Sequence, residues 1–99
     1  MFINTIELPT IYSGKESEFL EWFKWSSNVY KTFDGFISRR LLKPTKGSGN
    51  YVILMEHENE KTFMHMHSSH EQKESMAKLK LLIEGSPAAK FYEVVTDTL

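Results

Sequence analysis

The first side chain that stands out for possible chemistry is Asn4. It lies within residues 2–9, where side-chain types alternate loosely with the period of two that predicts a β-strand. Asn4 then shares a face with apolar neighbours, where an amide needs hydrogen-bond partners. Two interpretations stay open: a structural hydrogen bond at a sheet edge, or a group that orients a ligand or acts in catalysis. The apolar neighbours are Phe2, Ile6 and Leu8.

Three histidines lie in a mostly polar segment, residues 61–75. On a helix His67 and His70 share a face because they are three residues apart, whereas His65 points elsewhere. A metal site would therefore need a carboxylate from another element. We predict no metal centre from this segment, and solvated side chains are the simpler interpretation.

Two further groups of residues admit a structural and a functional interpretation. Arg39 and Arg40 alternate across a predicted strand, so one should face solvent or a subunit interface, and a surface ion pair is the simpler role for either. A set of aromatic and methionine side chains favours a core or a pocket wall over a specific cofactor site. That set is Trp22, Phe23, Trp25, Met64 and Met66.

The composition excludes several classes of function. The 99 residues carry 12 basic and 13 acidic side chains, so nothing indicates binding to nucleic acid or to an anionic membrane. The absence of cysteine excludes disulfides and thiolate chemistry and fits a reducing compartment. The start of the sequence has no basic region followed by an apolar run, so we expect a cytoplasmic protein without signal peptide or membrane span.

Two helical regions are predicted. The first begins at Ser13, because residues 13–16 match the S-x-x-E capping box, and it ends near Thr32. The second extends from Thr62 to about Leu82, with a break at residues 68–69, where two serines follow one another.

The remaining strands complete a recognisable order. Residues 36–42 and 51–55 form a hairpin around a Pro- and Gly-containing loop, and residues 89–95 form the last strand. The order β-α-β-β-α-β predicts a ferredoxin-like α+β fold in a single domain, residues 1–99, with an antiparallel sheet and both helices on one face. Strand residues that point both ways are apolar, so we expect a second copy to cover the other face in a homodimer.

The hairpin carries a resemblance to known proteins. Gly35-Phe36, the run from Arg40 to Gly47, and Tyr51 to Leu54 resemble the antibiotic biosynthesis monooxygenase superfamily, and the resemblance extends over nearly the whole chain. It implies a dimeric α+β barrel and an oxygenase acting on a small molecule. Within the superfamily, the haem-degrading monooxygenases of the IsdG type are the most similar.

That resemblance implies haem as cofactor, although the sequence departs from it. The haem degraders use an Asn on the first strand, a helical Trp and a His that binds the iron. Asn4 matches the first position, whereas Met66 stands at the Trp position and Ser75 or Met76 at the His position. If haem binds, Met76 could offer its thioether, and His70 and then His67 could offer imidazoles. Trp22, Phe23 and Phe63 would form the pocket.

Three hypotheses for the function follow. The first is an O₂-dependent monooxygenase that binds and degrades haem in a pocket between the sheet and the helices. The second is an oxygenase that uses no cofactor, in which a quinol-like aromatic substrate itself reduces O₂ and the protein supplies desolvation and a base. The third is a non-catalytic, ligand-binding dimer of the same fold.

Overall fold

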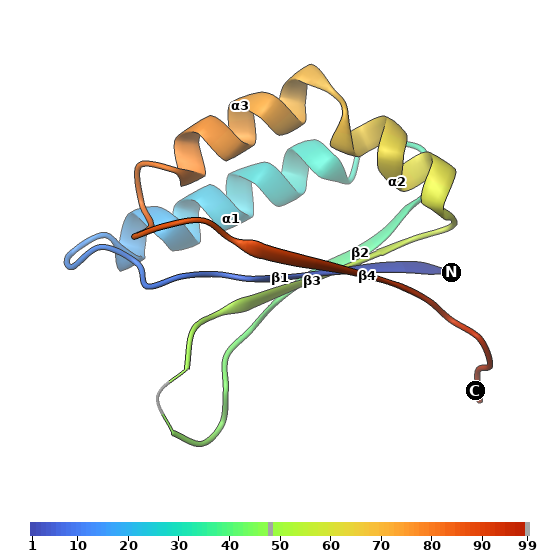
Figure 1. The fold of residues 1–99 in the computed structure, drawn as a ribbon. Coiled ribbons are helices and arrows are strands. Elements are labelled where there is room, and N and C mark those ends of the chain that lie inside the picture. The colour runs from blue at the N-terminus through green and yellow to red at the C-terminus, as the bar shows by residue number, and fades with distance from the viewer. Residues whose placement is uncertain (48, 99) are drawn as a thin grey trace.

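The computed structural model describes residues 1–47 and 49–98, and its elements follow the predicted order (Figure 1). The second helical region divides into two helices at Ser68 and Ser69, as expected. The elements are β1 (Phe2–Glu7), α1 (Glu16–Tyr30), β2 (Phe36–Leu42), β3 (Val52–His57), α2 (Glu60–His67), α3 (His70–Leu79) and β4 (Ala88–Glu93).

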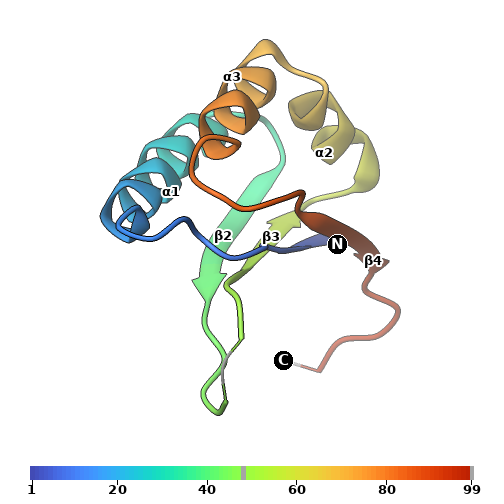
Figure 2. The same ribbon diagram turned by 60° about the vertical axis from the view of Figure 1, so that its left-hand side comes forward.

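The sheet is antiparallel with the strand order β2-β3-β1-β4. All three helices lie on one face of it, and the other face is open (Figures 1 and 2). This arrangement confirms the predicted ferredoxin-like α+β fold. The strand boundaries differ by a few residues: β1 ends at Glu7 and β4 at Glu93, and β3 extends to His57. The loop predicted between the hairpin strands includes Ser48, which lies outside the described residues.

The predicted capping box at Ser13 is wrong. Helix α1 begins at Glu16, and its N-cap residue, Lys15, makes no side-chain capping bond. Gly14 has a φ of +80°, and the Lys15 amide donates to the Tyr12 carbonyl, so residues 12–15 form a turn instead of the first helical turn. The other two helices do have capping side chains: Asn59 accepts from the Thr62 amide and Ser69 from the Gln72 amide.

Gly35 fixes the approach of the hairpin to α2. Its φ is +82°, and a Cβ placed there would lie 2.4 Å from the Thr62 side chain. Only glycine accommodates both the backbone conformation and this close contact. The Gly35-Phe36 pair therefore has a packing reason that is separate from any chemistry.

The core forms two clusters between the sheet and the helices. One cluster joins α1 and α3 to the sheet, and the other joins α2 to it. Burying each large apolar side chain contributes about 1.5–3 kcal/mol. The first cluster consists of Leu8, Phe19, Trp22, Ile53, Leu79, Leu82 and Ile83; the second consists of Phe2, Tyr30, Met55, Phe63 and Met66.

No helix within residues 1–47 and 49–98 has the length and apolar character needed to cross a membrane. The expected cytoplasmic location stays a prediction.

Candidate functional site

A small cavity lies between the sheet and the helices, where the two core clusters meet. Its free volume is about 20 Å³, enough for one water-sized group. Most of its lining is apolar, with polar side chains contributed by β1, β2 and all three helices. The polar residues are Asn4, Tyr30, Arg39, His67 and Gln72; the apolar ones are Ile6, Trp22, Ile53, Met55, Phe63, Met66, Met76 and Leu79.

Asn4 is a buried polar group on the floor of this cavity. Only 3% of it is exposed, and it lies on the helix-facing side of β1. Its Nδ2 donates to the Lys90 carbonyl of β4 at 3.1 Å, which holds the amide in one orientation. The structural part of the expectation for Asn4 is met by this bond, and its role in catalysis stays a prediction.

The expected wall residues divide between the cavity and its surroundings. Trp22, Phe63, Met66 and Met76 all line the cavity. The Trp22 indole donates to the Ser75 carbonyl at 2.9 Å, which ties α1 to α3 above the cavity. Phe23 was also expected in the wall, but it does not line the cavity. Its ring contacts Arg39.

Of the two histidines proposed as ligands, only His67 lies at the cavity. Its ring is exposed to solvent and stacks on Phe63 with 5.4 Å between ring centroids. His70, ranked first from the sequence, is the exposed first residue of α3 and takes no part in the lining. The described residues contain no group of three His, Cys, Asp or Glu side chains arranged to hold a metal ion.

The fourth histidine, His57, is fully buried at the end of β3. Its Nδ1 lies 3.0 Å from the Thr62 hydroxyl, and its Nε2 has no hydrogen-bond partner among the described residues. Burial lowers the pKa of His57, with a smaller opposing effect from Glu58. The rings of Phe36 and Phe63 pack edge-on against it, so His57 belongs to the core, outside the cavity lining.

Haem does not fit the residues present. Sites for drug-sized ligands enclose about 300–1,000 Å³, far more than the free space of about 20 Å³ here. The thioethers of Met66 and Met76 pack into this space with the core, and the one imidazole at the cavity, His67, is stacked on Phe63. The donor set and the volume both disagree with a resident macrocycle.

Arg39 also lies at the cavity, which was not expected from the sequence. Its guanidinium lies against three rings of α1, with its central carbon 4.6 Å from the ring centroid of Phe23, 4.8 Å from that of Tyr30 and 5.3 Å from that of Trp22. Nη1 donates to the hydroxyls of Ser26 and Ser27, both at 2.8 Å.

The charge on Arg39 has no counter-ion among the described residues. No ion pair joins it to a carboxylate in the part of the chain that the structure describes, and its buried Nε has no hydrogen-bond partner there. Burial lowers the pKa of Arg39 to about 10, with a smaller opposing effect from Tyr30. At neutral pH the cavity therefore contains a positive charge stabilised by rings and hydroxyls.

Tyr30 and Gln72 link α1 to α3 at the same cavity. The Tyr30 hydroxyl donates to the Gln72 side-chain oxygen. Burial raises the pKa of Tyr30, although Ser75 and the Arg39 charge oppose this. Tyr30 therefore stays a neutral donor at neutral pH.

Open grooves adjoin the cavity, and two of them concern the expected site residues. One, of about 390 Å³, lies at the β4 edge and shares His67 with the cavity lining; Phe2, Glu60, Met64 and Phe91 complete it. The other, of about 470 Å³, lies beside α3 and shares Met76 and Leu79 with the lining. Either groove has room for an aromatic ring system.

The sequence reasoning missed Arg39, Tyr30 and Gln72 as members of the site. One signal for Arg39 was present. Arg39 and Leu41 are two residues apart in β2 and therefore share a face, so one of the two adjacent arginines had to point under the helices. No pattern indicated Gln72, because its position depends on the angle between α3 and α1.

The sequence matches no protein-family model and no curated protein. Solved structures do share the fold. Several are described as a “putative antibiotic biosynthesis monooxygenase”, among them the following two. The one from Deinococcus radiodurans has a TM-score of 0.84 at 13% identity, over 100% of this chain and 96% of that one. The one from Caulobacter crescentus has a TM-score of 0.81 at 18% identity, over 96% and 91% of the two chains.

A third similar structure is SnoaB from Streptomyces nogalater, a cofactor-independent oxygenase. Its TM-score is 0.76 at 16% identity, over 99% of this chain and 93% of that one. At these identities the comparisons show that the chain has the ferredoxin-like α+β fold of these oxygenase structures. The chemistry of this chain has to be argued from its own cavity.

Proposed function

We propose that this protein is a monooxygenase of the antibiotic biosynthesis monooxygenase superfamily that oxygenates a small, quinol-like aromatic compound without a cofactor. The observation that carries the proposal is the cavity beneath the helices, where a few fixed polar groups lie among apolar walls. The likeness to the fold of SnoaB supports the same class of reaction.

The reaction needs only the substrate, O₂ and the protein. A base removes the proton of the phenol or enol, and the resulting anion gives one electron to O₂. The substrate radical and superoxide then combine into a C–O bond, and the peroxide anion takes back the proton from the base. The resulting hydroperoxide loses water, with the second hydrogen of the same carbon, to leave a carbonyl. One oxygen atom ends in the product and the other in water.

The residues at the cavity divide these tasks. His67, at the rim, supplies an imidazole nitrogen that can accept the proton. The Nδ2 of Asn4 donates to the carbonyls of Lys90 and Thr5, which leaves its Oδ1 to accept a hydrogen bond from the hydroperoxide. The apolar walls exclude water from the radical pair. A ring enters this space only when Met66 and its neighbours move, since the free volume is about 20 Å³.

Oxygen uptake with anthrone tests the proposal, because anthrone ionises as a phenol-like enol and gains one oxygen to become anthraquinone. Protein treated with a chelator and free of flavin and haem should accelerate uptake above the buffer rate. Asn4→Ala should lower the rate about 100-fold, whereas Thr5→Ala, next to it on the other face of β1, should leave it unchanged. Equal rates in protein and buffer for anthrone and for a panel of naphthols would contradict the proposal.

Haem degradation is the alternative to be tested: Asn4 matches the Asn on which that resemblance rests, although the donor set and the volume of the cavity disagree with haem. A hemin titration followed by absorbance separates the two. The proposal predicts no saturable Soret shift. A stoichiometric shift that His67→Gln abolishes, and that His65→Gln keeps, would favour haem instead.

We also propose that the protein is a homodimer. Several large side chains are about half exposed, including Ile37, Leu42 and Tyr92, and a second copy would cover such apolar surface. Light scattering after gel filtration should give twice the 11.6 kDa of one chain. A mass of one chain at micromolar concentration would contradict this.

A further inference from the structure

We propose that Arg39 binds the ring oxygen of the substrate in its anionic form, so that the cavity selects aromatic compounds that ionise at oxygen, as phenolates or enolates. This inference deepens the proposed function and rests on it for the assignment of the cavity as the substrate site. It concerns the class of substrate and the residue that recognises it.

The position of Arg39 follows from the register of the sheet. Arg39 pairs with Met55, Met55 with Asn4, and Asn4 with Phe91. These four residues form one row across the strands on the helix-facing side. Since neighbouring strands lie about 4.8 Å apart, the backbones at Asn4 and Arg39 are roughly 10 Å from one another. A single ring system above Met55 spans that distance.

The row also gives the direction from which a substrate approaches. Its outer end, Phe91, is half exposed and lines the groove at the β4 edge together with His67. Its other end is Arg39 on β2, the opposite edge strand of the sheet, beneath the rings of α1. A ring that enters from the groove therefore passes His67 first, lies over Asn4 and Met55, and brings its leading atom to the guanidinium.

The groups around Arg39 limit what that leading atom is. A ring that displaces Met66 and its neighbours meets a single guanidinium there, which suits one anionic oxygen. The neighbouring Tyr30 hydroxyl and the Gln72 amide are bonded to each other. Arg39 is the only cationic side chain that lines the cavity among the described residues.

The charge of Arg39 matches an anion. Its partners are neutral: two serine hydroxyls, the Phe23 carbonyl at 3.3 Å and three ring faces. A cation in an apolar region without a counter-ion is unfavourable, and an anionic ligand there removes part of that cost. Nε is buried and free of any partner among the described residues, so a donor remains for the ligand.

The test uses two probes that share one ring system: 4-nitrophenol, whose phenolate absorbs in the visible range, and 4-nitroanisole, whose additional methyl group prevents ionisation. Binding of each is measured by titration at a pH at which free 4-nitrophenol is about half ionised. Wild-type protein should raise the phenolate fraction of bound 4-nitrophenol. It should also bind that probe about 10- to 100-fold more tightly than 4-nitroanisole, the affinity expected from one hydrogen bond to a charged group.

Three variants decide the role of Arg39: Arg39→Met removes the charge, Arg39→Lys is the conservative change, and Arg40→Met is the control. Arg39→Met should abolish both the preference and the shift in ionisation, while its affinity for 4-nitroanisole stays within about twofold. Arg39→Lys should restore part of both effects, because it keeps the charge without the planar donor geometry. Arg40→Met should behave as wild type, since Arg40 belongs to the same strand and faces away from the cavity.

Each outcome separates this inference from the proposed function. If the wild type binds both probes equally, or if Arg39→Met keeps the phenolate preference, the inference is wrong. If the preference depends on Arg39 but no aromatic substrate consumes O₂, the anion site stands and the oxygenase proposal falls. If anthrone is oxygenated equally well by Arg39→Met, the oxygenase proposal stands and the role of Arg39 falls.

Discussion

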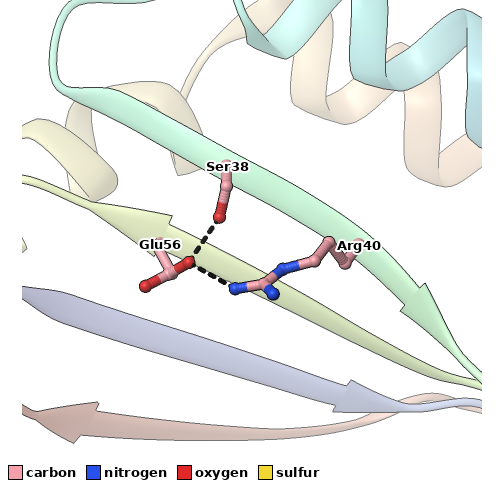
Figure 3. A network of polar contacts seen from close by, with 3 residues as sticks. All are labelled: Ser38, Arg40 and Glu56. Atoms are coloured by element: carbon pink, nitrogen blue, oxygen red, sulfur yellow. Dashed lines mark hydrogen bonds and ion pairs between the residues drawn. The ribbon is translucent and has the colours of Figure 1, made fainter.

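Two adjacent residues of β2, Arg39 and Arg40, have opposite surroundings. Arg40 projects onto the open face, where 61% of its side chain is exposed and its Nη2 lies 2.8 Å from the Glu56 carboxylate, to which Ser38 also donates (Figure 3). Arg39 points under α1, against three rings and without a carboxylate. The same type of side chain forms an ordinary surface ion pair on one face, whereas on the other it is a partly buried charge with no carboxylate partner among the described residues.

The difference indicates where function resides in this fold. A solvated ion pair such as that of Arg40 and Glu56 changes the free energy of unfolding very little. A buried cation without a partner is costly, and such groups are concentrated where proteins bind or transform ligands. Variants of the two faces therefore test whether Arg39 serves the cavity or only the packing.

The largest expected difference is in turnover. Arg39→Met should lower the rate of O₂ uptake with anthrone about 100-fold, because the anion that reduces O₂ loses its positive partner. Arg40→Met should keep the wild-type rate. The initial rates of the two variants, measured side by side in an oxygen electrode, check this. A loss of similar size in both variants would show that the comparison of the two faces is mistaken.

The next largest effect is on the free energy of unfolding. Arg39→Met should lower the reaction rate but should not lower this free energy. The pKa of Arg39 is lowered by burial to about 10 in the folded chain. The cost of its charge is therefore fully present below pH 10 and disappears as the pH rises towards the higher, ordinary pKa of arginine.

At pH 7 the pKa shift corresponds to roughly 3 kcal/mol. The free energy of unfolding of Arg39→Met should stay unchanged or rise by up to about this amount, measured by urea denaturation. A decrease of more than about 1 kcal/mol, beyond the error of the extrapolation, would assign Arg39 to the packing.

A third prediction uses the buried histidine as a contrast to the exposed ones. Because burial lowers the pKa of His57 below its ordinary 6.5, the neutral form is favoured in the folded chain. The contribution of neutral His57 to the free energy of unfolding is present above pH 6.5. It is lost as the pH falls through the lower pKa that His57 has in the folded chain.

The stability of the wild type should therefore decrease from pH 7 to pH 5, and His57→Gln should flatten that slope. The control, His70→Gln, should leave the slope unchanged, since His70 is exposed. Denaturation midpoints across this pH range measure both, and identical slopes in the wild type and His57→Gln would refute the assignment.

The smallest effect is expected on the open face. The pKa of Glu56 is lowered, first by the hydrogen bond that Ser38 donates at 2.6 Å and then by Arg40. Glu56→Gln should still change the free energy of unfolding by less than about 1 kcal/mol, because its partner Arg40 is well exposed. Thermal unfolding at pH 7 measures this, and the O₂ uptake rate should not change. An altered rate would mean that the open face contributes to the site.

The fold could be predicted from the sequence because its signals are local. The hairpin between Phe36 and the end of β3 has turn residues in its loop, and the serines at positions 68 and 69 break the second helical region. The one failed boundary signal, the capping box at Ser13, competed with a glycine turn that its pattern does not reveal.

The candidate site was less predictable because it depends on packing between distant segments. Asn4 could be singled out, since the period of a strand places it among apolar neighbours. His70 was ranked above His67 because it lies next to the expected helix break, but at that break it is an exposed residue outside the cavity lining. A surface ion pair was the simpler role expected for Arg39 and Arg40, and Arg39 instead packs against the rings of α1.

The most direct test of the whole account is the fate of ¹⁸O₂ in a single experiment. Protein free of haem, flavin and metal is mixed with anthrone under ¹⁸O₂, and the anthraquinone is analysed by mass spectrometry. The account predicts one labelled oxygen in the product, formed faster with wild type than with Arg39→Met or buffer. Labelled product that appears only after hemin is added, or at the buffer rate in every sample, would contradict it.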